Sequence, residues 1–230
     1  MSFRGRFAVT LLFATTMAYF EAAVVVYLRR LWELGALDVA VLSLSNRIVL
    51  TEVGREAASL VMIVSVAILV GRRSVERLGW VAIVFGVWDL LYYGFLRLLS
   101  DWPRSVFDWD VLFLIPRPWI GPVLAPSLVS AALVTAGSVV VVREASGRPF
   151  RPGLREWLAA LVGGVIVIGS FVTVSVPATP ADDPEGFSWP IFLAGLLVAL
   201  AGFFVAARRP AQAASGAGRS SRVEDGLLSR

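Results

Sequence analysis

Six long runs of apolar residues, each close to the length needed to cross a lipid bilayer, constrain this chain more than any other feature. A transmembrane helix needs about 20 mostly apolar residues to cross roughly 30 Å of hydrocarbon. The runs that meet this requirement are Phe7–Leu28, Ile48–Val70, Gly79–Leu99, Trp119–Val142, Trp157–Val176 and Trp189–Ala207. We therefore predict an all-α polytopic membrane protein whose six transmembrane helices form a single domain over residues 1–209, with the lipid bilayer as its main partner.

The overall composition favours the same class of protein. Of the 230 residues, 57% are hydrophobic and 17% are charged, which is too apolar for an ordinary soluble domain. The first run contains Glu21 and lacks a small-x-small cleavage site, so we expect a retained helix instead of a signal peptide. Residues 210–230 are rich in Ala, Ser, Gly and Arg, and we expect a disordered cytoplasmic tail there.

The arginines predict the orientation of the helices. If the N-terminus lies inside the cell, 14 of the 21 basic residues fall on the cytoplasmic side and 7 on the other side. This bias predicts that both termini are cytoplasmic and that the protein lies in the inner (plasma) membrane. The pair Arg29 and Arg30, which follows the first run on the outer side, is the main departure from the rule. Because the arginines flank apolar runs, the net charge of +4 does not indicate a nucleic-acid partner.

The residue types that are missing exclude several kinds of chemistry. The chain contains no Cys and no His, and all its basic residues are Arg. These absences exclude thiolate and imidazole metal sites, disulfides, Cys or Ser–His nucleophiles, and a lysine Schiff base. Proton or metal chemistry would therefore depend on carboxylates, Tyr hydroxyls and backbone groups.

The connector between the third and fourth runs, residues 101–118, is more than a simple link. Pro103 and Ser105 suit the start of a helix, and Pro116 and Pro118 would end it. Its Trp and Phe side chains favour the headgroup level of the membrane. We expect an outer interfacial helix here, although the proline-rich end also suits a re-entrant turn. Within the fourth run, Pro126 should kink the helix.

Charge within the apolar runs is confined to the first three. Glu21 lies about two-thirds along the first, and Glu52 and Glu56 project from one face at the outer end of the second. Asp89 lies near the middle of the third. The complete set of candidate site residues is Glu21, Glu52, Arg55, Glu56, Asp89, Tyr92, Tyr93, Arg97, Asp108 and Asp110.

Charge of this kind predicts a polar site, because an ionised carboxylate inside hydrocarbon costs at least a few kcal/mol without a partner. Our main hypothesis is an outward-facing acidic site that handles a cation, a proton or a small polar solute. Glu21 and Asp89 would be its central groups, and Arg97 their counter-ion.

Two other hypotheses fit the same residues. In the first, Glu21, Glu56 and Asp89 hold a divalent cation (Mg, Ca or Mn) in a membrane enzyme that acts on a lipid or isoprenoid. In the second, the charges are structural ion pairs in a subunit of a membrane complex, and Glu52 and Glu56 complement a helix dipole. The small residues of the last three runs suit close packing, a homo-oligomer or a membrane-complex partner.

Overall fold

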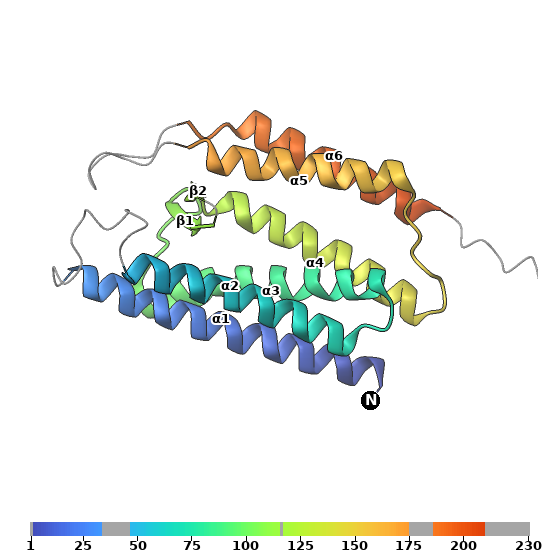
Figure 1. Cartoon of the computed structure of the whole chain (residues 1–230), viewed down its shortest axis with the longest axis horizontal. Coiled ribbons are helices and arrows are strands. Elements are labelled where there is room, and N and C mark those ends of the chain that lie inside the picture. Colours follow the sequence, from blue (N-terminus) through green and yellow to red (C-terminus); the bar gives the residue numbers. More distant parts are fainter. Residues whose placement is uncertain (1, 34–46, 116, 175–185, 210–230) are drawn as a thin grey trace, which may run out of the picture.

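The computed structural model describes residues 2–33, 47–115, 117–174 and 186–209 (Figure 1). Within these ranges it contains six helices, each long and apolar enough to cross a membrane. They are α1 (Phe3–Glu33), α2 (Arg47–Val70), α3 (Ser74–Ser100), α4 (Leu124–Ala145), α5 (Leu154–Val172) and α6 (Trp189–Arg208). The prediction of a multi-pass helical membrane protein is confirmed. The expected tail, 210–230, and the last residues of the fifth run, 175–176, lie outside the described residues.

Consecutive helices run in opposite directions, so the bundle has two distinct ends (Figure 1). One end, called the hairpin end below, holds the strands β1 (Trp109–Phe113) and β2 (Trp119–Pro122). The other, called the terminal end, holds the start of α1 and the end of α6. The helix α3 packs against α4, α1 and α2, while α5 and α6 pack mainly against each other.

The connector between α3 and α4 differs from the prediction. We expected an interfacial helix, but the described part of this connector contains β1, which pairs with β2 in an antiparallel sheet. Asp110 lies opposite Gly121 in this pairing. Aromatic and β-branched residues in β1 favour a strand. Pro118 directly precedes β2 and Pro122 is its last residue, positions where the missing N–H does least harm.

The fourth transmembrane helix begins later than predicted, because residues 119–122 form β2. Since α4 starts at Leu124, Pro126 falls in its first turn. Backbone N–H groups in a first turn have no partner within the helix, so proline is tolerated there. The predicted kink at Pro126 therefore has no physical cause.

Glycines allow two helix pairs to approach closely. A Cβ added to Gly86 of α3 would lie 2.5 Å from the carbonyl oxygen of Ser130 in α4. A Cβ on Gly163 of α5 would lie 2.5 Å from the carbonyl oxygen of Gly195 in α6. Among the small residues of the fourth run, Ala131 and Thr135 of α4 are exposed, so they do not pack against another helix of the described chain.

The α5–α6 pair is joined to the other helices near both ends. At the hairpin end, Trp119 of β2 and Ala125 of α4 belong to one hydrophobic cluster with Phe171 of α5 and with Trp189 and Phe192 of α6. At the terminal end, Phe150 stacks on Phe203 of α6 with ring centroids 5.4 Å apart. Arg143 at the end of α4 donates there to the carbonyl oxygen of Ala207.

Candidate functional site

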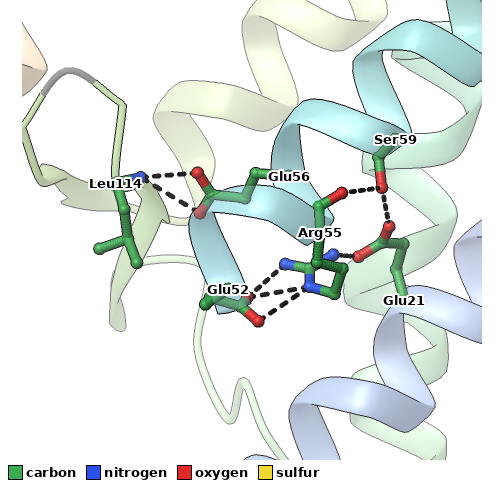
Figure 2. Close-up of polar contacts among 6 residues, drawn as sticks. All are labelled: Glu21, Glu52, Arg55, Glu56, Ser59 and Leu114. Carbon is green, nitrogen blue, oxygen red and sulfur yellow. Dashed lines mark hydrogen bonds and ion pairs between the residues drawn. The ribbon is translucent and has the colours of Figure 1, made fainter. Parts of the chain in front are cut away.

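Arg55 joins the first two helices at the hairpin end of the bundle. Figure 2 shows its guanidinium between Glu21 of α1 and Glu52 of α2. The side chain of Glu21 is 3% exposed, and it also accepts a hydrogen bond from the hydroxyl of Ser59. Glu21 is therefore satisfied by one cation and one hydroxyl, which is the arrangement that a buried carboxylate requires.

Glu52 acts as the second partner of Arg55. The Arg55 Nε lies 3.0 Å from both oxygens of the Glu52 carboxylate, three residues away on the same helix. The alternative role as a helix-dipole partner is wrong, because α2 starts at Arg47 and has no acidic residue in its first turn. Glu52 instead holds the guanidinium that reaches Glu21.

Glu56 points toward the connector and away from Glu21 (Figure 2). Its two carboxylate oxygens accept the backbone N–H of Leu114 at 3.0 and 3.1 Å. Leu114 directly follows β1, so this contact anchors the strand to α2. Glu56 is 7% exposed, and a backbone donor accounts for its position.

Asp89 lies near the middle of α3 and has a different environment. The hydroxyl of Ser130 on α4, which is 1% exposed, donates to the Asp89 Oδ2 at 2.8 Å. Within the described parts of the chain, no arginine forms an ion pair with Asp89. Asp89 is therefore a membrane-embedded carboxylate that has a hydrogen-bond donor and lacks a counter-ion there.

A second carboxylate, Asp110 of β1, lies close to the same region. The hydroxyl of Tyr93 donates to its Oδ2 at 3.2 Å, and the Nη2 of Arg29 lies 3.5 Å from its Oδ1. The Arg29 guanidinium also covers the ring of Trp102, 3.9 Å from its centroid. Burial raises the pKa of Asp110 to about 7; Arg29 and Tyr93 oppose that rise, and the Asp89 carboxylate adds to it.

The remaining candidates have other contacts. Tyr92 packs its ring against Tyr93, with centroids 5.1 Å apart. Arg97, expected to be the counter-ion of the carboxylates, turns to the carbonyl oxygen of Asp101 at 2.5 Å, and its side chain is 52% exposed. Asp108 accepts the backbone N–H groups of Arg104 and Ser105, so it closes a turn of the connector.

The three proposed metal ligands do not share partners. Glu21 binds Arg55, Glu56 binds the Leu114 backbone, and Asp89 binds Ser130. Among the described residues, no group of three or more Asp or Glu side chains could hold a metal ion. The geometry divides the candidates into an ion-paired set around Arg55 and a less compensated pair, Asp89 and Asp110.

Sequence reasoning missed three partners. Ser59 and Ser130 are single hydroxyls within apolar helices, where they resemble ordinary packing residues. Arg29 departs from the charge bias, and an arginine at the end of a predicted span can reach a carboxylate at the same level, as Arg29 does with Asp110. The acidic residues of the connector 101–118, expected at the same surface as Arg29, were the signal that could have identified the pair of Arg29 and Asp110.

Comparisons with protein-family models, with curated proteins and with solved structures give no match to this chain, so no family is assigned to it.

Proposed function

We propose that this chain is an inner-membrane protein that binds a proton or a small cation at Asp89 and exchanges it with the hairpin end through Asp110. The observation that carries this proposal is the environment of Asp89: a carboxylate in the middle of a membrane-spanning helix, bonded to Ser130 and with no cation beside it in the described chain. A negative charge held there is unfavourable, so binding a proton or a cation stabilises the site.

A second feature supports exchange with the hairpin end. Tyr93 follows Asp89 by one helical turn, or about 6 Å along the axis of α3. Its hydroxyl bonds to Asp110, which in turn meets the 35% exposed Arg29. These groups form a polar series from mid-membrane toward the surface. The pKa of Asp110, about 7, suits a group that takes up and releases protons near neutral pH.

The direction of exchange follows from the proposed topology. The sequence has 14 arginines in the segments predicted to be cytoplasmic and 7 in the others, which favours both termini in the cytoplasm. The hairpin end, with Asp110 and Arg29, then faces outward. Asp89 opens toward the outer side in this arrangement, and Glu21 with Arg55 holds α1 and α2 beside it.

The test is flux through proteoliposomes that contain the purified full-length chain. An internal pH dye reports proton movement under an imposed pH gradient, and separate gradients of Na⁺ and K⁺ report cation movement. We expect a flux that requires the protein and that Asp89→Asn reduces to the level of empty liposomes. The thermal stability of Asp89→Asn should equal or exceed that of the parent, because the change removes an uncompensated charge.

Asp108→Asn is the matched control, since it makes the same chemical change in a connector turn at the same end of the molecule. An amide oxygen still accepts the two backbone N–H groups that Asp108 binds, so flux should persist. Equal flux in Asp89→Asn and the parent would contradict the proposal. An absence of flux for every gradient, together with a loss of stability in Asp89→Asn, would assign the carboxylate to structure alone.

A further inference from the structure

A hollow of about 640 Å³ lies at the terminal end, far along the bundle from Asp89. Its wall comes from the starts of α1 and α3, the turn between α2 and α3, and the end of α4. Five charged side chains line it: Arg6, Arg72, Arg73, Glu76 and Glu144. Three transmembrane helices and a turn therefore contribute charge to one concave surface.

The two carboxylates in the hollow are already bound. Glu76 is 4% exposed and accepts from Arg6 Nη1 at 3.1 Å and from the Arg72 backbone N–H at 2.9 Å. Glu144 pairs with Arg73 at 3.0 Å and accepts the backbone N–H of Phe150 at 2.7 Å. These contacts fix the acids against the wall and leave the guanidiniums partly available.

Positive charge remains in excess in the hollow. Three arginines face two glutamates, and the exposed Arg72 guanidinium has no hydrogen-bond or ion-pair partner among the described residues. The side chain of Arg73 is 53% exposed despite its pair with Glu144. The guanidinium of Arg6 also donates to the carbonyl oxygen of Val70, and its buried Nε has no acceptor among the described residues.

The helix beside these arginines adds to the same potential. Arg73 is the N-cap of the 27-residue helix α3, and no side chain caps its first N–H groups. The positive end of the helix dipole faces the region that the arginines occupy, and Glu76 in the first turn of α3 offsets part of it. Guanidinium groups next to open backbone N–H groups are a common arrangement for binding phosphate.

We propose that this hollow binds the phosphate of an anionic ligand. The turn of residues 71–73 lies between two membrane spans, at the level where phospholipid headgroups are found. An anionic phospholipid can bring its phosphate to Arg72 from the membrane, and free phosphate can reach the same group from solution. This site is separate from Asp89 and does not depend on the function proposed for it.

The test measures stabilisation of the full-length chain in an uncharged detergent at low ionic strength, with the 8 tryptophans as the fluorescence signal for unfolding. Three probes are titrated separately: phosphatidylglycerol, phosphatidylcholine with the same acyl chains, and inorganic phosphate. Arg72→Gln removes the unpaired guanidinium without leaving a buried charge. Arg155→Gln, an exposed arginine at the same end and outside the hollow, is the matched control.

We expect phosphatidylglycerol to raise the unfolding temperature more than phosphatidylcholine does. Arg72→Gln should raise the concentration for half-maximal effect about tenfold, the loss of one charge-assisted hydrogen bond, while Arg155→Gln leaves it unchanged. A matching response to inorganic phosphate identifies the phosphate group itself as the ligand, and a response to phosphatidylglycerol alone identifies a lipid headgroup. Equal responses to the two lipids without any response to phosphate, or equal effects of the two substitutions, would overturn the proposal.

Discussion

Removing Arg55 should destabilise the protein more than removing Glu21, although the two residues form one ion pair. Arg55→Gln leaves two carboxylates without their cation, those of Glu21 at 3% exposure and Glu52 at 19%. Glu21→Gln leaves Arg55 bound to Glu52 through its Nε and Nη2 atoms. The two substitutions therefore leave different amounts of uncompensated charge.

The size of the difference follows from burial. Breaking a buried pair by removing one partner costs about 3–5 kcal/mol when the remaining charge has no other partner, and we expect this cost for Arg55→Gln. After Glu21→Gln, the 21% exposed Arg55 keeps Glu52, and the new amide still accepts from Ser59. We therefore expect a loss of about 1–2 kcal/mol. The double variant that combines Arg55→Gln with Glu21→Gln should lose about 1–3 kcal/mol less unfolding free energy than the sum of the two single losses.

The free energy of unfolding can be measured by titrating the folded protein with a denaturing detergent in mixed micelles, following tryptophan fluorescence. Glu52→Gln is the control for charge alone, because Arg55 then retains its buried partner Glu21. We expect Glu52→Gln to cost less than Arg55→Gln. Additive losses in the double variant, or a loss in Glu21→Gln as large as in Arg55→Gln, would refute the assignment of Arg55 as a shared cation.

Three further results are expected. Because the pKa of Asp110 is raised from 3.8 to about 7, its protonated form stabilises the folded state. This stability is fully present below pH 3.8 and is lost as the pH rises through about 7. Asp110→Asn should remove this dependence when stability is measured against pH. Gly163→Val should cost on the order of 1–3 kcal/mol because its Cβ would lie 2.5 Å from the α6 backbone, whereas Gly164→Val, which meets nothing within 4 Å, should be tolerated in the same unfolding assay. Since the chain has no Cys, single variants Ser105→Cys and Ser146→Cys can be labelled in intact cells with an impermeant maleimide; only Ser105→Cys should react, and the reverse pattern would contradict the proposed orientation.

The positions of the helices could be predicted because the bilayer requires long apolar runs with internal backbone hydrogen bonds. The run Ile48–Val70 corresponds to α2 from Arg47 to Val70, and Trp189–Ala207 corresponds to α6 from Trp189 to Arg208. The predicted start of the fourth helix was wrong at residues 119–122. These residues form the strand β2, but they are apolar and therefore extend the hydropathy signal of α4 toward the N-terminus. Hydropathy alone cannot separate a short apolar strand from the start of a helix.

The candidate site was predictable only within single helices. The spacing of Asp89 and Tyr93 places them one turn apart on α3, and that relation needs no knowledge of the other helices. The partners Ser130 and Arg29 lie on α4 and α1, and their contacts depend on how the helices pack. The close approach of α3 and α4 at Gly86 sets this register, and single-sequence periodicity does not contain it.

Glu21 and Asp89 are both carboxylates within membrane-spanning helices, yet their surroundings give them different physical meanings. An ionised acid near the middle of a membrane costs about 2.5–3.5 kcal/mol on insertion scales. At Glu21, the guanidinium of Arg55 and the hydroxyl of Ser59 offset that cost, so the charge itself holds α1 to α2. At Asp89, Ser130 supplies one hydrogen bond, which an asparagine would receive equally well without the charge. A carboxylate at position 89 therefore adds nothing to packing that an amide would lack, and its distinguishing property is the ability to bind a proton or a cation.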